Sequence, residues 1–321
     1  MPDLPLSASG QTAADVARLC AREAGAIIME RFPGRGGGRR EPMRPERTMK
    51  GRGNFVTETD LACERAVLDI LAREYPDHPV LSEETADGWA SRRETGDTRH
   101  QTGDTGHETG DTRHETRDTG CGGDVSRVPS AVSRGGGWLW VVDPLDGTHN
   151  FSQGIPQFAF NIALCRDGDP VLGLTSAPTT GEEFFAQAGG GLLVNGEPAR
   201  VSATPSLAQS VWGMDMGYDD ARAARLISLL AEVWPGVQSV RVMGSAALGL
   251  AYAACGRYDL FVHHYLFPWD IAPGIVLVRE GGGQIVSRDG EPITIYSEGV
   301  VAGAPGPVRD FLRRARGKAW R

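Results

Sequence analysis

The sequence lacks the cysteine pattern of a disulfide-bonded or zinc-binding protein. Its five cysteines are an odd number, stand far apart and include no Cys-x-x-Cys pair. It also has no apolar run near the roughly 18 residues that would suggest a membrane span. The opening residues, MPDLPLSASG, contain neither the basic nor the apolar part of a secretion signal. We therefore expect free thiols in a soluble, cytoplasmic protein that has no membrane partner.

Acidic residues outnumber basic ones in the chain as a whole, 41 to 33. The formal net charge is −8, so the protein as a whole is not expected to attract nucleic acid or an anionic membrane. The exception is segment 31–52, which has eight Arg or Lys against two Glu, together with many Gly and Pro. We interpret it as a solvated loop or hairpin. A nucleic-acid contact is the alternative, although Phe32 is its only aromatic residue for stacking on bases.

Apart from Cys121, apolar residues are missing from residues 94–121, which form four consecutive heptads: ETGDTRH, QTGDTGH, ETGDTRH and ETRDTGC. No a or d position is apolar, which excludes a coiled coil, and nothing in the repeat offsets the entropy cost of ordering it. We predict that about 86–137 is a disordered surface insertion that interrupts one domain. Its three histidines could bind a metal, but a flexible solvated repeat is the preferred interpretation.

The rest of the chain has the apolar content and periodicity of a globular α/β protein, with 40% hydrophobic residues overall. Helical spacing predicts helices over about 12–32 and 60–75. The segments PVLSEET, WLWVVD, QFAFNIALC and PVLGLTSAP read as strands, the last three in an antiparallel meander. Helices and strands then alternate to the C-terminus. We predict one domain over 11–316, with an α+β half at about 11–205 and an α/β half at about 206–316.

The segment VVDPLDGTHNF, residues 141–151, places two carboxylates around a proline at the end of a buried strand. Carboxylates as close as Asp143 and Asp146 share either a proton or a cation. An Asp-Pro or Asp-Gly alone would indicate only a turn. Here Gly147 and Thr148 follow directly and would add backbone N–H groups and a hydroxyl suited to an anion. The segment therefore favours a metal and phosphate site.

Three other acidic segments strengthen this hypothesis. TETD places Asp60 at a helix start, SEET places Glu83 and Glu84 at a strand end, and PWDIAPG offers Asp270 as a helix N-cap. Each of them alone would more often be a cap or a solvated charge. All of them together suggest a carboxylate cage for a hard cation such as Mg²⁺.

In this order the motifs TETD, EE, DPLDGTHNF and WDIAPG resemble those of the inositol monophosphatase-like family of magnesium-dependent, lithium-sensitive phosphatases. The resemblance runs from about Thr12 to the C-terminus, outside the insertion. It implies a layered α-β-α-β-α sandwich of the sugar-phosphatase type, a homodimer, and two or three Mg²⁺ ions. The implied activity is hydrolysis of a small phosphate monoester. Fructose bisphosphatase, histidinol-phosphatase and nucleotide 3′-phosphatase activities stay open as alternatives for the same site.

The resemblance also implies roles for individual residues. Glu83, Asp143 and the carbonyl of Leu145 would bind one ion. Asp143, Asp146 and Asp270 would bind a second. Thr148, hydrogen-bonded to Asp60, would orient the attacking water together with Glu83. The predicted substrate contacts are Asp146, Gly147, Thr148, Gly244, Ser245, Ala246, His263 and Asp270.

Two positions depart from the family pattern. His263 stands where relatives that act on inositol phosphates usually carry a glutamate. It is interpreted either as a partner for a substrate hydroxyl or as a surface residue, and a sugar phosphate stays open as the substrate. Because neighbouring strand residues point to opposite faces, only one of His263 and His264 is expected to face the site. Pro273 replaces the usual alanine and is expected in the first turn of a helix capped by Asp270, where it would be tolerated.

Overall fold

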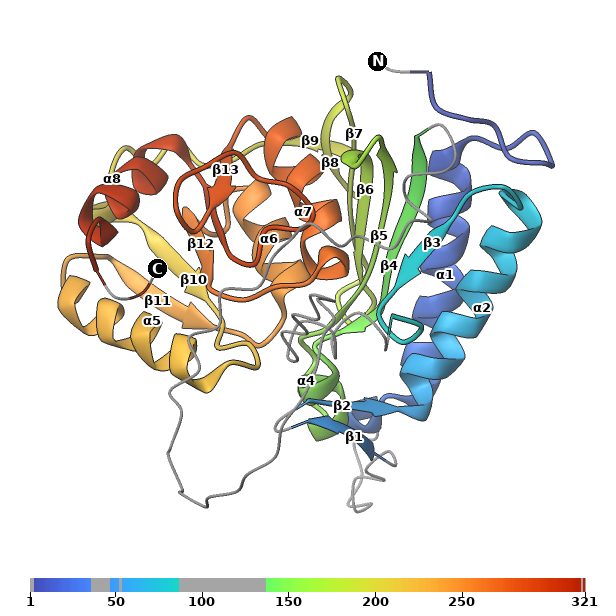
Figure 1. Cartoon of the computed structure of the whole chain (residues 1–321), viewed down its shortest axis with the longest axis horizontal. Helices are drawn as coiled ribbons and strands as arrows, with labels where there is room; N and C mark the ends of the chain where they lie inside the picture. The colour runs from blue at the N-terminus through green and yellow to red at the C-terminus, as the bar shows by residue number, and fades with distance from the viewer. Residues whose placement is uncertain (1–2, 36–46, 52–53, 87–136, 319, 321) are drawn as a thin grey trace, which may run out of the picture.

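The chain is described here by a computed structural model (Figure 1). It covers residues 3–35, 47–51, 54–86, 137–318 and 320. The heptads and most of the basic segment lie outside these described residues, so the disorder predicted for 86–137 and the nucleic-acid alternative are not tested by the structure. Among the helices of the described part, none is long and apolar enough to cross a membrane.

The first half of the chain builds a seven-stranded sheet with the strand order β3-β4-β5-β6-β7-β8-β9. Its strands are β3 (Val80–Ser82), β4 (Trp138–Asp146), β5 (Ala159–Arg166), β6 (Asp169–Ala177), β7 (Glu182–Gln187), β8 (Gly191–Val194) and β9 (Glu197–Ala199). Strand β3 pairs parallel with β4, and all later pairs are antiparallel, which confirms the predicted meander. Helices α1 (Ala13–Arg31) and α2 (Glu58–Glu74) precede the sheet in sequence.

The second half builds a five-stranded sheet with the order β11-β10-β12-β14-β13. Its strands are β10 (Val211–Met214), β11 (Ser239–Val242), β12 (Leu260–His263), β13 (Gln284–Ser287) and β14 (Val300–Gly303). The helices of this half are α5 (Asp220–Val233), α6 (Ala246–Ala254), α7 (Pro268–Glu280) and α8 (Pro305–Ala315). The smaller elements are η1 (Pro33–Arg35), β1 (Arg47–Gly51), β2 (Asn54–Thr57), α4 (Thr148–Gln153) and η2 (Leu207–Gln209). Strand β1, at the end of the basic segment, pairs antiparallel with β2.

Five layers of secondary structure pack around three apolar cores. Helices α1 and α2 cover one face of the seven-stranded sheet, α6 and α7 lie between the two sheets, and α5 and α8 cover the far face of the five-stranded sheet (Figure 1). Strand β4 shows how alternation builds two of these cores. Trp140 and Val142 face the core under α1 and α2, whereas Leu139 and Val141 face the core between the sheets. The α-β-α-β-α sandwich is therefore confirmed, while the division at about residue 205 stays a prediction.

Cysteines in the described part are free thiols, as predicted. Cys20, Cys63 and Cys165 are buried and Cys255 is half-buried. Burial raises the pKa of the Cys20 and Cys63 thiols to about 12, so these side chains behave as small apolar residues.

Helix α7 begins earlier than predicted. Its first residue is Pro268, whose fixed φ suits that position, and Phe267 is the N-cap. Asp270 is the third residue of the helix, and its carboxylate accepts the N–H of Phe267 at 2.7 Å. The prediction that Asp270 is the N-cap was wrong. Pro273 consequently lies inside the helix and not in its first turn.

The helix nevertheless continues to Glu280, because a side chain replaces the hydrogen bond that Pro273 cannot make. Pro273 has no N–H for the carbonyl of Trp269, four residues earlier. The buried side chain of Asn161, on β5, donates Nδ2–H to that carbonyl at 2.9 Å. Thr175 on β6 donates its hydroxyl to Asn161 Oδ1 at 2.6 Å. The sheet therefore holds α7 at the turn that carries Asp270.

Replacing Asn161 with leucine should lower the free energy of unfolding by about 1–3 kcal/mol, because the Trp269 carbonyl and the Thr175 hydroxyl would be left buried without partners. Urea denaturation measures this change. Pro273→Ala, which restores a backbone N–H to the helix, should recover part of the loss in the Asn161→Leu background and gain little in the wild type. Equal stability of Asn161→Leu and the wild type would contradict the compensation.

Candidate functional site

A β-bulge brings the two aspartates of the DPLD segment to the same side of β4. Residues three apart on a regular strand point to opposite faces. The pairing of β4 with β5 shifts between Asp143, opposite Asn161, and Asp146, opposite Ala159. The extra residue lies at Pro144–Leu145, and the N–H of Leu145 donates to Asp143 Oδ1 at 3.0 Å. Both carboxylates can therefore face one site.

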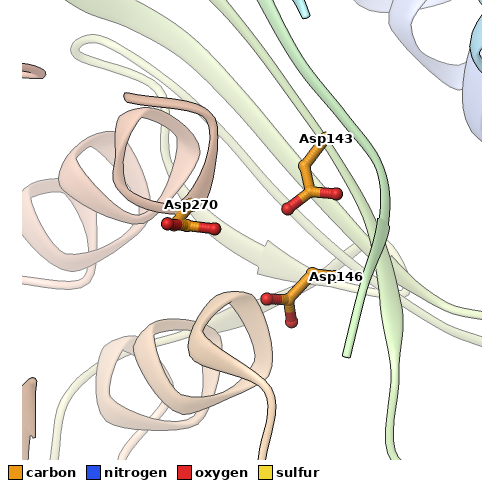
Figure 2. A group of neighbouring side chains, drawn as sticks. All are labelled: Asp143, Asp146 and Asp270. Atoms are coloured by element: carbon orange, nitrogen blue, oxygen red, sulfur yellow. The ribbon is translucent and has the colours of Figure 1, made fainter. Parts of the chain in front are cut away.

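Helix α7 supplies the third carboxylate. One oxygen each of Asp143, Asp146 and Asp270 lies within 4.8 Å of the other two (Figure 2). Figure 2 shows the two strand residues facing the helix residue across a common space. Mg²⁺ binds oxygen at about 2.0–2.1 Å, so ligands on opposite sides of the ion stand about 4.2 Å apart. A small approach of the three carboxylates toward one another would therefore let them bind such a cation, and a set of oxygen ligands suits it.

The electrostatics of this carboxylate cluster also call for a cation. Burial, followed by the charges of Glu83, Asp146 and Asp270, raises the pKa of Asp143 well above its ordinary range. Burial raises the pKa of Asp146 to about 7, and burial with the charge of Asp146 raises that of Asp270 to about 8. No Lys or Arg within the described ranges forms an ion pair with the cluster. Buried negative charge without a cationic side chain is stable only when protonated or bound to metal.

Thr148 lies beside the cluster and is held by Asp60, as predicted. Its hydroxyl oxygen is 3.0 Å from Asp60 Oδ1 and 3.0 Å from the carbonyl oxygen of Leu145. Asp60 is the third residue of α2, and its other oxygen accepts both the N–H and the hydroxyl of Thr57, the helix N-cap. Burial raises the pKa of Asp60. The capping box thus fixes a carboxylate that in turn orients the Thr148 hydroxyl.

The predicted substrate-contact segment 244–246 is attached directly to Asp146. The hydroxyl of Ser245, the N-cap of α6, donates to Asp146 Oδ2, and the N–H of Ala247 donates to the same oxygen at 3.3 Å. Gly147 has φ +85°, and a Cβ there would lie 3.0 Å from the Gln157 carbonyl oxygen and 3.2 Å from that of Gly244. Position 147 therefore requires glycine where the two segments meet.

Two polar side chains that the sequence did not single out hold the same segment. Asn150 donates Nδ2–H to the carbonyls of Met243 and Gln157, at 2.7 Å each. Asp215, at the end of β10, accepts the N–H groups of Met243 and Gly244 at 2.9 and 2.6 Å. These bonds connect both sheets at the site. Asn150 stands in the quoted motif, whereas Asp215 has no local sequence signal.

Glu83 lies next to the cluster but outside the 4.8 Å group. It follows β3 directly, and its N–H donates to the Val142 carbonyl at 3.3 Å. After burial, its charge is the largest cause of the raised pKa of Asp143. The structure therefore brings Glu83 close to Asp143 without placing it among the three converging oxygens.

His263 and His264 are both buried, which corrects the surface interpretation of His263. Their rings also stack, with centroids 5.3 Å apart and planes at 8°, and do not point to opposite faces. The reason is that β12 ends at His263, so the strand alternation does not extend to His264. Burial lowers the pKa of His263 to about 3 and that of His264 to about 4, so both rings are neutral at pH 7.

Tyr218 is a further residue near the site that sequence reasoning missed. The residue as a whole is 45% exposed. Desolvation by the surrounding protein, together with the charges of Glu83, Asp270, Asp146 and Asp143, raises the pKa of its phenol well above the ordinary value. The hydroxyl therefore stays protonated near the carboxylates. Its proximity arises from tertiary structure, and no motif marks it.

Comparisons with known proteins agree with this geometry. The sequence model described as the inositol monophosphatase family matches residues 10–320. Inositol monophosphatase 1 of Solanum lycopersicum is 32% identical over 263 residues, which are 80% of this chain and 80% of that protein. The crystal structure of the extragenic suppressor protein suhB from Bartonella henselae matches with a TM-score of 0.73 and 27% identity, covering 95% of this chain and 98% of that one. An inositol monophosphatase structure from Thermotoga maritima matches with a TM-score of 0.69 and 26% identity, over 94% of this chain and 95% of that one.

These matches favour phosphate monoester hydrolysis of the inositol monophosphatase type over the other activities considered from the sequence. The chain belongs to the inositol monophosphatase family and is a hydrolase of phosphoric monoesters.

Proposed function

We propose that the chain hydrolyses a small phosphorylated alcohol with Mg²⁺ held by Asp143, Asp146 and Asp270. One observation supports this most: two buried carboxylates and the half-buried carboxylate of Asp270 converge within 4.8 Å, and no described cationic side chain pairs with them. Glu83 and the Leu145 carbonyl would complete a second ion site that shares Asp143. Two or three ions in total and a homodimer are further parts of this proposal and follow from family resemblance. A cytoplasmic location is proposed from the sequence pattern alone.

When bound, magnesium supplies positive charge that attracts the phosphate dianion and lowers the pKa of water. The protein's own contribution begins with the Thr148 hydroxyl, which has one hydrogen and two acceptors at 3.0 Å. Donation to Asp60 leaves the Leu145 carbonyl free to act as a ligand. It also leaves the lone pairs of Thr148 free to accept a hydrogen from the attacking water. Glu83 would accept the second hydrogen of that water and so fix its direction of attack.

The phosphate and the alcohol would lie on opposite sides of Asp146. The backbone N–H groups of Gly147 and Thr148 would bind the phosphate, and Gly244, Ser245 and Ala246 would contact the hydroxyls of the alcohol. This placement is supported by the approach of the two segments at Gly147 and by the attachment of Ser245 to Asp146.

His263 would present a hydrogen-bond donor to the substrate where relatives present an acceptor. Its Nδ1 accepts the N–H of Tyr265 at 3.2 Å. Because the ring is neutral, its single proton then resides on Nε2. A donor at this position can bind a hydroxyl oxygen or an additional anionic oxygen of the substrate. We therefore expect tolerance of sugar phosphates as well as inositol monophosphate.

A panel of substrates at fixed Mg²⁺ tests the proposed function. Inositol monophosphate and hexose monophosphates should release phosphate faster than fructose 1,6-bisphosphate, histidinol phosphate or a nucleoside 3′-phosphate. Chelation of the metal should abolish release, because the phosphate would then meet only buried negative charge. Asp270→Asn is the matched variant, and undiminished release by it would contradict the metal assignment.

A further inference from the structure

Helix α2 carries two buried carboxylates one turn apart, and only Asp60 belongs to the predicted machinery. Glu64 is the other, with 5% of its surface exposed against 1% for Asp60. Residues four apart on a helix share a face. A buried glutamate is costly unless its oxygens accept hydrogen bonds, so the partners of Glu64 indicate what it stabilises.

The partners of Glu64 all belong to the loop after β3. Glu64 Oε1 accepts the N–H of Glu84 at 3.1 Å and the N–H of Thr85 at 3.1 Å, and the Thr85 hydroxyl lies 3.5 Å away. Two backbone N–H donors converge on one carboxylate oxygen. Charge-assisted bonds of this kind are stronger than neutral ones.

Glu83 is the residue immediately before this loop, so the bonds to Glu64 hold its next two neighbours in the chain. Strand β3 has only three residues in register with β4, ending at Ser82 opposite Val142. Beyond that pair, one backbone bond from Glu83 to Val142, at 3.3 Å, continues the pairing. Glu64 therefore fixes the backbone directly after Glu83, where the register of β3 with β4 has ended.

We propose that Glu64 is a positioning residue that fixes Glu83 relative to Thr148. From the same face of α2, Asp60 holds the Thr148 hydroxyl at 3.0 Å. One helix therefore holds both Thr148 and the loop that follows Glu83. The inference rests on the proposed function, in which Glu83 and Thr148 together orient the attacking water. Its consequence is that Glu64 acts on catalysis through Glu83 and without touching the substrate.

Glu64→Leu tests this role, with Glu74→Leu as the matched control. Glu74 is also a buried carboxylate of α2, but it lies at the other end of the helix and binds Ser9 and Arg73. Glu64→Leu should lower kcat by about 10- to 100-fold and weaken Mg²⁺ binding, measured by calorimetry, by a similar factor. Losses of this size are usual when a residue that supports a metal ligand is removed. The KM for the substrate should change little. Glu74→Leu should lose stability but keep both values. Glu64→Gln should retain most activity, since its amide oxygen can accept the same two N–H groups.

A double-mutant cycle with Glu83→Gln separates this inference from the proposed function. If Glu64 acts through Glu83, Glu64→Leu should reduce kcat in the wild type but add little in the Glu83→Gln background. Equal fold-losses in both backgrounds would overturn the positioning role and leave the proposed function standing. An unimpaired Glu83→Gln variant would overturn the proposed role of Glu83 and the inference with it. If Glu64→Leu does not fold, Glu64→Asp, which keeps the charge and shortens the reach, should give the same pattern with a smaller loss.

Discussion

Asp146→Asn will lower kcat for phosphate monoester hydrolysis by about 10³-fold at saturating Mg²⁺. The variant removes a charge from the three converging oxygens, and metal-ion stabilisation of the transition state is worth several kcal/mol. Asparagine keeps the volume of the side chain and an oxygen that can accept from Ser245 and from the N–H of Ala247. The loss is therefore expected to arise from the missing charge. Release of inorganic phosphate measures it.

Two further measurements test whether misfolding causes the loss of kcat in Asp146→Asn: the stability of the metal-free variant and the activity of a control variant. Removing one of three neighbouring, mutually repelling carboxylates should leave the metal-free Asp146→Asn variant at least as stable as the metal-free wild type. Asp259→Asn is the matched control, because Asp259 is also buried but binds Ser202, Thr204 and the N–H of Val211, outside the cluster. It should keep its kcat. Wild-type activity in Asp146→Asn would contradict the role assigned to this residue.

Magnesium should raise the thermal stability of the wild-type protein strongly. Burial and mutual repulsion raise the pKa values of the clustered carboxylates. A cation bound between them therefore stabilises the folded state, and it has no such site in the unfolded chain. A ligand at about 100 times its Kd adds about 2.7 kcal/mol to the free energy of unfolding. Differential scanning calorimetry with increasing Mg²⁺, after chelation of bound metal, measures the effect.

The double variant Asp146→Asn/Asp270→Asn provides the control for this shift. It lacks two of the three converging charges, so its melting temperature should not depend on Mg²⁺. An equal magnesium-dependent rise in the double variant and the wild type would place the stabilising ion elsewhere in the protein.

Local signals in the sequence predicted most of the fold and part of the site. The pairing of β4, β5 and β6 follows from strand periodicity, and the Thr57–Asp60 segment reads directly as a helix start. The DPLD segment marked its two carboxylates because both lie in one short stretch. What it did not reveal is the bulge at Pro144–Leu145, which alone puts them on one side of the strand.

Errors arose where a local signal has two structural explanations. A carboxylate at the N-cap and one at the third helical position both accept a backbone N–H near the helix start, so PWD did not distinguish Asp270 from Phe267 as the cap. The expectation that His263 and His264 point to opposite faces assumed that both lie in a strand, but β12 ends at His263. The first outcome depended on where a helix begins and the second on where a strand ends, and tertiary packing sets both positions.

Other contributors have no local signal at all. Asn161 is 112 residues before Pro273 in the sequence, and its amide takes the place of a helical N–H. Glu64 resembles any charged residue of an amphipathic helix until the loop after β3 is placed against it. Such roles become visible only when segments distant in sequence are brought together.

Anomalous diffraction from crystals soaked in Mn²⁺, a substitute for Mg²⁺, tests the central claim most directly. The account predicts an anomalous peak between the carboxylates of Asp143, Asp146 and Asp270 in the wild type, and its loss in Asp146→Asn. Well-ordered wild-type crystals with no peak between these three side chains, or with peaks only elsewhere, would contradict it.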